Sequence, residues 1–202
     1  MKRFLGFIVC LTLVLGTLFP LLEAEQVNAA ANSDTAAVNL TVAATISISA
    51  PADVSLGTIT GTGASSTGTA LWTIITNNSG GYKLELQASA AALTSGSDTI
   101  AAYTPAVADT PETWSVATTA SEWGARLKST STDAAAEWGT DTTAEKWLNV
   151  NNAAVRQIVS RTTETDAAGS AETVAFKAEV GSSKLQPTGS YTVNVTATAT
   201  TL

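Results

Sequence analysis

The stretch Gly189-Ser-Tyr-Thr-Val-Asn-Val-Thr-Ala-Thr-Ala-Thr-Thr-Leu202 decides the fold class. From Tyr191 to Ala199 every odd position is apolar, and every even position is threonine or asparagine. Successive side chains of a strand point to opposite faces, so this alternation predicts a β-strand with one face on a core. Threonine and valine branch at the β-carbon, which suits a pleated sheet. The partner strands must come from earlier in the chain.

Several earlier segments alternate in the same way. Val38 to Ile48 is apolar at every even position, which predicts one long first strand. Ala70 to Thr76 is apolar on both faces, which predicts a central strand. The turn Asn77-Asn-Ser-Gly-Gly81 separates it from the alternating run Tyr82 to Ala88, and this combination predicts a β-hairpin.

The remaining segments are shorter or less regular. Val54 to Ile59 predicts a short strand, and residues 89–113 predict a loop with one edge strand near Ile100. Val174 to Val180 alternates strictly, whereas Ala154 to Arg161 slips by one residue, which predicts a β-bulge. Short strands with Gly, Pro and Asn turns and almost no helix predict an all-β fold, an antiparallel β-sandwich of the immunoglobulin-like or jelly-roll type.

Residues 114–147 are a Trp-rich insertion in this sandwich. Thr119-x-x-Glu122 and Thr142-x-x-Glu145 match the capping-box pattern, which predicts a partly helical excursion. Indole faces can stack on sugar rings, so the tryptophans could bind a glycan. They could also close one end of the sandwich, and we favour this interpretation because contiguous exposed apolar area is uncommon without a partner. The candidate ligand-binding residues are Trp114, Trp123, Trp138 and Trp147.

The N-terminus predicts a secretory signal peptide at residues 1–29. Lys2 and Arg3 precede an apolar run that ends at Leu22, and Val27-Asn-Ala29 has the small residues of a cleavage site. The alternative is an uncleaved membrane anchor, since the run could nearly span a bilayer. We expect cleavage, a single domain at residues 30–202, and a secreted or cell-surface location. Membrane contact is expected only through the signal peptide.

Composition argues against most catalytic chemistries. The chain has no histidine, and its one cysteine, Cys10, lies in the predicted signal peptide. His-based triads, Cys nucleophiles and common zinc sites therefore lack their residues, and we expect neither a metal nor a cofactor. The net charge of −7, with only ten Lys and Arg, argues against nucleic acid as a partner. We expect a protein that is not an enzyme.

One enzymatic alternative stays open. Glu122 and Glu137 each precede a Trp-Gly pair. Two carboxylates hydrolyse glycosides when they lie about 5 Å apart in retaining enzymes, and farther apart in inverting ones. The sequence does not supply this distance, and a capping role already explains Glu122. A carboxylate-dependent glycan hydrolase is the remote alternative.

The ending Gln186-Pro-Thr-Gly-Ser-Tyr-Thr-Val-Asn-Val-Thr-Ala-Thr-Ala199 resembles the closing strand of secreted prokaryotic surface β-sandwiches. It is similar to that of WxL-like wall proteins and of spore-coat-U or fimbrial subunits. Thr76 to Tyr82 and Glu122 to Leu127 resemble further elements of such proteins. The resemblance implies a structural or adhesive protein. In some fimbrial families a subunit donates an N-terminal strand to its neighbour, and unpaired strands recruit other chains readily. The residues that would exchange here are Val38, Leu40, Val42, Ile46 and Ile48.

Three functions from different classes follow. The first is a non-enzymatic surface protein, structural or adhesive, with further copies of itself or a cell-wall or glycan surface as partners. The second is a secreted carbohydrate-binding module that uses exposed tryptophans, and the third is the hydrolase. We expect the first, because export and all-β patterning accompany the missing catalytic residues. Buried tryptophans would favour it, and two glutamates facing one cleft would favour the hydrolase.

Overall fold

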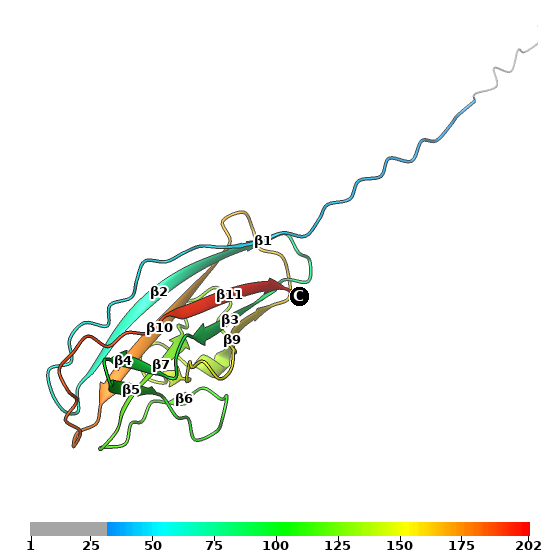
Figure 1. The fold of residues 1–202 in the computed structure, drawn as a ribbon. Coiled ribbons are helices and arrows are strands. Elements are labelled where there is room, and N and C mark those ends of the chain that lie inside the picture. Colours follow the sequence, from blue (N-terminus) through cyan, green and yellow to red (C-terminus); the bar gives the residue numbers. More distant parts are fainter. Residues whose placement is uncertain (1–31) are drawn as a thin grey trace, which may run out of the picture. The chain divides into compact units, whose positions relative to one another are not determined.

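The computed structural model describes residues 32–202, and the predicted signal peptide lies outside them. The described residues fall into two units, 32–41 and 42–202. Unit 32–41 contains no strand or helix, and all the strands lie in the second unit (Figure 1). The described part contains no helix that is both long and apolar enough to cross a membrane. The strands are β1 (Ile46–Ile48), β2 (Ser65–Thr76), β3 (Tyr82–Ala88), β4 (Ala92–Ser95), β5 (Asp98–Ala102), β6 (Glu112–Thr113), β7 (Ser121–Leu127), β8 (Lys146–Trp147), β9 (Arg156–Arg161), β10 (Ser170–Val180) and β11 (Val195–Thr201).

These strands form three sheets. The largest has the order β1-β2-β10-β7-β5-β4, a second has the order β11-β3-β9, and β6 pairs with β8 alone. All pairs are antiparallel except β5 and β7, which run parallel where Ala101 pairs with Glu122. The prediction of an all-β chain is confirmed. The predicted antiparallel pairing is right for every strand pair of the described residues but this one.

The two larger sheets share one hydrophobic core. On β3 the side chains of Tyr82, Leu84 and Leu86 are buried, and the residues between them are more exposed. On β2 the even positions from Ala70 to Thr76 are buried in the same way, while Leu71 is half exposed. The alternation in the sequence therefore marks the faces that meet in this core. The predicted central strand is confirmed only in part, because β1 pairs with β2 only over residues 74–76 and the outer face of β2 is exposed at Leu71 and Ile75.

The turn at residues 77–81 joins two sheets rather than two neighbouring strands. β2 belongs to the six-stranded sheet and β3 to the three-stranded one, so the predicted hairpin is wrong. Gly81, with φ 79°, provides the left-handed backbone conformation of this turn. The Asn78 side chain donates hydrogen bonds to the carbonyls of Gly81 and Leu202, which fixes the crossing to the end of β11.

Two further segments differ from the predicted pattern, and one agrees. Residues 54–59 form no strand. In the predicted loop at 89–113 the strand expected near Ile100 is present as β5, but it lies inside the sheet, and β4 and β6 are additional strands. The predicted bulge is confirmed: the pairing of β3 with β9 shifts between Leu84 and Glu85, which leaves Ile158 as the extra residue.

The Trp-rich insertion is mostly strand and turn, so the predicted helical turns are wrong. Glu122 and Trp123 lie in β7, and residues 142–145 form a turn before β8. Only Ala136–Trp138 forms a short 3-10 helix in this insertion. β7 pairs along its whole length with β10, and this ladder outweighs the local capping pattern.

Candidate functional site

The predicted N-terminal exchange strand divides into a free part and a paired part. Val38, Leu40 and Val42 are 94%, 89% and 74% exposed and lie outside any strand. Ile46 and Ile48 lie in β1, which pairs with β2 of the same chain. The prediction of one long strand from residue 38 to residue 48 is therefore wrong. β2 ends at Thr76, opposite Ile46, so the preceding residues have no partner strand.

Asn77 marks the boundary between the two parts. Its Oδ1 accepts hydrogen bonds from the backbone N–H of Thr45 at 2.7 Å and from the Thr45 hydroxyl at 3.2 Å. Its Nδ2 donates to the carbonyl of Ala43 at 3.0 Å. Thr76 adds a bond from its hydroxyl to the Thr45 carbonyl. These contacts hold residues 43–48 to their own domain. The exposed apolar row, which consists of Val38, Leu40 and Val42, precedes them in the chain.

The four candidate tryptophans do not form one exposed platform. Trp123 and Trp138 are buried in the main core, and Trp147 is buried in a smaller cluster with Tyr103 and Ala175. Trp114 is half buried and packs against that smaller cluster. The four tryptophans, which are close together in the sequence, are therefore divided between two clusters in the structure.

Other side chains of the same chain pack around the Trp114 ring. The ring of Tyr103 stacks on Trp114 with centroids 4.5 Å apart, and Trp147 meets it edge-on at 5.5 Å. Lys177 Nζ lies 5.0 Å from the Trp114 ring centroid, and the indole N–H donates to Glu179 at 2.8 Å. This arrangement fastens residues 103–147 to β10. It leaves little indole surface for a sugar ring.

An ion-pair network holds the other end of this insertion. Arg126, on β7, is almost fully buried, and its Nη atoms lie 3.0 Å from both Asp141 and Glu145. Its Nη2 also donates to the carbonyl of Trp138. Burial raises the pKa of Asp141, but the Ser129 N–H and the charges of Lys128 and Arg126 outweigh it and lower that pKa overall. Both Nη atoms of Arg126 have partners within the insertion, which indicates a structural role, while Arg126 Nε has no hydrogen-bond partner among the described residues.

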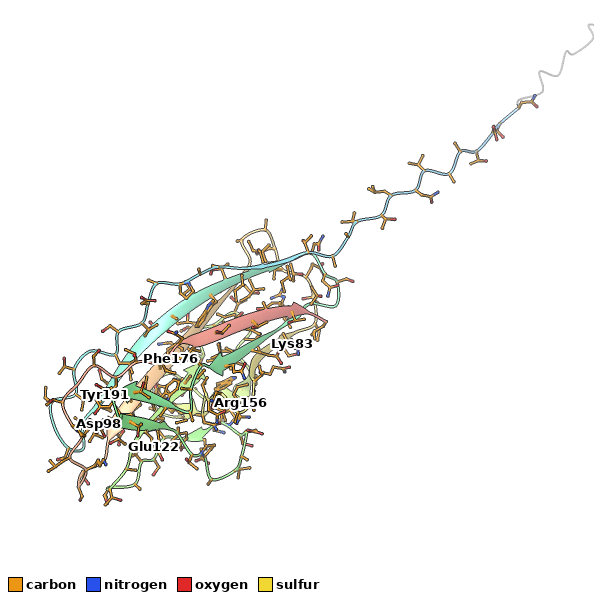
Figure 2. All side chains as sticks on the ribbon, in the orientation of Figure 1. Lys83, Asp98, Glu122, Arg156, Phe176 and Tyr191 are labelled. Carbon is orange, nitrogen blue, oxygen red and sulfur yellow. The ribbon has the colours of Figure 1, made fainter. Side chains whose placement is uncertain are left out.

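Glu122 and Glu137 occupy different surroundings. Glu122 lies at the start of β7 (Figure 2), is half buried, and pairs in register with Glu179 of β10. Burial raises its pKa. Glu137 is exposed on the 3-10 helix, next to Trp138, whose carbonyl contacts Arg126 at the other end of β7. Neither glutamate lines the cleft described below.

A buried carboxylate network escaped the sequence analysis. Glu172 is fully buried on the inner face of β10, and its Oε1 lies 3.0 Å from the Tyr82 hydroxyl. The same hydroxyl lies 3.0 Å from Asp133, which also forms an ion pair with Arg161 at 3.0 Å. Burial raises the pKa of Glu172 to about 7, and the charge of Asp133 adds to the effect. In the sequence, Glu172 is a charged residue on the otherwise apolar side of a strand, and this position could have indicated a buried carboxylate.

One hydroxyl proton cannot serve two carboxylates. If Tyr82 donates to Asp133, it must accept from Glu172, which then carries a proton of its own. The Arg161 charge favours the ionised form of Asp133, so the geometry assigns the proton to Glu172. Glu172 Oε2 has no partner and is buried, which also suits a neutral acid better than a charged one.

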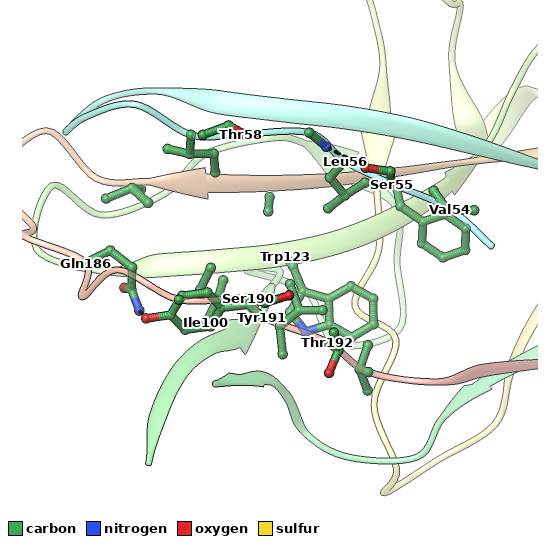
Figure 3. Close-up of a pocket in the computed structure, with 18 of the residues that line it drawn as sticks. Val54, Ser55, Leu56, Thr58, Ile100, Trp123, Gln186, Ser190, Tyr191 and Thr192 are labelled. Atoms are coloured by element: carbon green, nitrogen blue, oxygen red, sulfur yellow. Dashed lines mark hydrogen bonds between the residues drawn. The ribbon is translucent and has the colours of Figure 1, made fainter. Parts of the chain in front are cut away.

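A cleft of about 1230 Å³ opens onto the inner face of the six-stranded sheet. Cores normally contain few voids larger than a water molecule, so this volume is not ordinary packing. Figure 3 shows Val54 to Thr58 along one side and Gln186 and Ser190 to Thr192 along the other. We call residues 51–62 the first wall and residues 185–194 the second wall. The floor is apolar and consists of Ala70, Trp72, Leu93, Ile100, Trp123, Phe176, Ala178 and Val180.

Neither wall forms backbone hydrogen bonds on the side that faces the cleft, within the described residues. The first wall forms no backbone–backbone hydrogen bond within the described residues, although Val54, Leu56 and Ile59 pack on the core. In the second wall Thr192 pairs with Thr94 through both its backbone groups. Neighbouring residues of an extended strand direct these groups to opposite sides, so those of Tyr191 and Val193 point away from β4. No backbone–backbone bond involves them within the described residues.

Two polar side-chain atoms in the cleft also have no partner in the described part of the chain. Trp123 Nε1 and Gln186 Oε1 are buried and unbonded, and both residues line the cleft. Gln186 Nε2 donates to Tyr191 and to the carbonyl of Thr99, which fixes the orientation of the amide. The described chain therefore leaves one donor and one acceptor unbonded in its interior, in residues beside the cleft. Nothing in the sequence marked this combination, because the two residues are far apart in the chain.

The described residues contain no group of three or more His, Cys, Asp or Glu side chains that could hold a metal ion. Comparison with known proteins gives no further guide to the site. No protein family, no curated protein and no solved structure matches this chain.

Proposed function

We propose that this chain is an exported, non-enzymatic structural or adhesive protein of the cell surface that associates with further copies of itself. The fold would be a β-sandwich, with the six-stranded and three-stranded sheets as its two layers. Residues 38–42 would supply the contact. The observation that carries the proposal is the exposed row of Val38, Leu40 and Val42, three apolar side chains at strand spacing with no core of their own.

The energetics support strand pairing over a loose apolar contact. Burial of one such side chain contributes about 1.5–3 kcal/mol, so the row could contribute roughly 5–9 kcal/mol. Association costs an estimated 4–15 kcal/mol, so side-chain burial alone gives at best weak binding. Backbone hydrogen bonds to a second chain would add the missing part, as in β-strand addition. The alternation of apolar and polar residues suits this geometry.

The packing of the other candidate residues supports the same choice. Three of the four tryptophans are buried and the fourth is stacked, so a sugar-binding module would have no indole platform to use. Glu122 lies near the start of β7, whereas Glu137 lies on the 3-10 helix whose Trp138 carbonyl contacts Arg126 near the other end of β7, so this arrangement favours the non-enzymatic proposal over a glycan hydrolase. Hydrolysis of a soluble glycan that is abolished by Glu137→Gln would refute the non-enzymatic proposal.

The proposal is tested by size-exclusion chromatography with light scattering. The full chain should form oligomers or filaments whose size rises with concentration. The triple variant Val38→Ser, Leu40→Ser, Val42→Ser should be a monomer, because the apolar row is lost while residues 43–48 keep their own contacts. The matched control is Asn39→Ser with Thr41→Ser, on the opposite face of the same segment, and it should assemble like the parent. A full chain that stays monomeric at millimolar concentration would refute the proposal.

A further inference from the structure

Residues 128–134, which we call the strap, follow β7 and are attached to the six-stranded sheet through backbone groups. The Lys128 N–H donates to the Thr173 carbonyl at 2.9 Å. The Thr132 N–H donates to the Ala171 carbonyl at 3.0 Å. These bonds continue the ladder of β10 beyond the last residue that pairs with β7. Backbone amides do not titrate near neutral pH, so this attachment does not itself respond to protons.

The Asp133 carboxylate attaches the strap to the three-stranded sheet. It lies 3.0 Å from Arg161 Nη1 of β9 and 3.0 Å from the Tyr82 hydroxyl of β3. The Arg161 guanidinium also donates to the Glu164 carbonyl from Nε and from Nη2, so its position is fixed by β9 and the following turn. Arg161 therefore cannot follow Asp133 when the strap moves.

The number of protons in this cluster decides how well the strap is held. Glu172 of β10 faces the same Tyr82 hydroxyl at 3.0 Å. With a proton on Glu172, hydrogen bonds run from Glu172 to Tyr82 and on to Asp133, and the two carboxyl groups carry one negative charge. Without that proton, the single Tyr82 hydrogen must serve two carboxylates that repel each other in a buried site. An ionised carboxylate that is buried without a full set of partners is costly.

The groups that face Glu172 show which part of the cluster can yield. Tyr82 faces it from β3 and Asp133 from the strap, while Arg161 of β9 lies beyond Asp133. On β2 the residue in register is the uncharged Trp72. Glu172 is fully buried, whereas Asp133 is partly exposed. The strap is therefore the side on which a second negative charge can reach water.

We propose that the strap is a proton-controlled device, closed onto the three-stranded sheet while Glu172 is protonated and released from it when Glu172 ionises. Release moves Asp133 outward and admits water to Glu172, and the paired strands stay in place. A short segment at the end of a ladder can open locally in this way without global unfolding. The inference is independent of the proposed self-association.

The direction of the response follows from the cluster. Burial raises the pKa of Glu172 to about 7, and the charge of Asp133 adds to the effect. In the released state Glu172 would meet water and regain the ordinary value of 4.5. A rising pH therefore favours release, because the released state gives up the proton more readily. The strap is closed in acidic surroundings and opens as the pH passes neutrality.

Trypsin digestion measures the state of the strap with a reference in the same sample. Lys128 is the first residue of the strap, and Lys184 precedes the highly exposed Leu185. Cleavage after each lysine is followed by mass spectrometry, and the ratio of the two initial rates cancels the pH dependence of trypsin. The rate after Lys128, relative to that after Lys184, should rise about tenfold between pH 6 and pH 8, which is the change that the two pKa values imply.

Two variants separate release of the strap from general unfolding. Glu172→Gln stays neutral, so its cleavage ratio should remain at the low value of the parent at pH 6 throughout this range. Ile100→Ala removes a buried side chain of β5, outside the cluster, and so destabilises the whole fold. Its ratio at pH 6 should equal that of the parent.

Three results would overturn the proposal. The first is a cleavage ratio of the parent that does not change with pH. The second is an equal rise in Glu172→Gln, which would mean that another group controls the strap. The third is a ratio for Ile100→Ala at pH 6 that matches the parent at pH 8, because cleavage after Lys128 would then report only the loss of global stability.

Discussion

Two halves of the same β10 strand face very different coverings. At one end Glu172 meets Tyr82 of β3, a strand that is paired on both sides by β11 and β9. At the other end Ala178 lines the cleft, beneath a first wall (residues 51–62) that has no backbone ladder. Both coverings send apolar side chains onto the core. They differ in hydrogen bonding, so burial alone does not make a segment part of the rigid fold.

The difference assigns separate roles to the two halves. The closed half, under β3, carries the packed aliphatic core and the buried carboxylate network. The open half keeps a floor of large aromatic side chains beside an unfilled volume of about 1230 Å³. We expect stability to be concentrated in the first half, because the covering of the second half has no backbone ladder. Variants in each half should therefore change different measurements.

The largest effect is expected from truncation of a side chain in the closed half. Leu84→Ala removes a fully buried leucine from β3 and should lower the free energy of unfolding by about 2–5 kcal/mol, because it leaves a cavity in packed surroundings. Leu56→Ala in the first wall is the matched control and should cost less than about 1.5 kcal/mol, since that side chain is only half buried beside an open cleft. Urea denaturation of both variants measures the difference. Equal losses would contradict the distinction between the halves.

The second prediction concerns pH and the closed half. The pKa of Glu172 is about 7 in the fold, against 4.5 for an ordinary glutamate, so the folded chain binds a proton that the unfolded chain releases between these values. Stability from this group is therefore full below about pH 4.5 and is lost as pH rises through 7. The loss should be roughly 3–3.5 kcal/mol, because the two pKa values differ by about 2.5 and each tenfold difference in proton affinity between the folded and unfolded chains corresponds to about 1.4 kcal/mol.

Glu172→Gln isolates this effect. The amide keeps the shape and stays neutral, so the variant should lose the decline between pH 4.5 and 7 and should be more stable than the parent at pH 8. Glu179→Gln, on the outer face of the same strand, is the control and should keep the decline. Denaturation midpoints at pH 5, 6, 7 and 8 provide the measurement. A parent and a Glu172→Gln variant with parallel pH profiles would show that Glu172 is ionised in the fold.

Sequence analysis predicted those features that depend on local alternation. The strand at Tyr82–Ala88 was predicted with its observed bounds because one of its faces is apolar. The same signal predicted strands at 174–180 and 191–199, but the structure begins them at Ser170 and Val195, and Thr192 forms only an isolated bridge. The bulge near Ile158 was visible because the period slips there. Each of these signals lies within a few consecutive residues.

The missed features depend on partners that are distant in the chain. The prediction of a hairpin at residues 77–81 was wrong because the turn pattern does not indicate which sheet the second strand joins. The first strand was predicted too long because β2 ends at Thr76, which the sequence of residues 38–48 does not reveal. The cleft is lined by residues as distant in the chain as Trp72, Trp123 and Gln186, a grouping that only the folded chain provides.

The smallest expected change in stability comes from a substitution beneath the first wall, in the open half. Gly68→Ala places a methyl group against Val54 and the Ser55 carbonyl, so the first wall must shift outward. A rigid covering would make this overpacking cost about 1–3 kcal/mol. Because the first wall has no ladder, it should move instead, and the loss should stay below about 1 kcal/mol, partly offset by the lower entropy of the unfolded alanine chain. Limited proteolysis should then cut residues 51–62 faster than in the parent. Thr69→Ala, exposed on the outer face, should leave the cleavage rate unchanged. A large loss of stability with no faster cleavage would mean that the first wall is as fixed as β3.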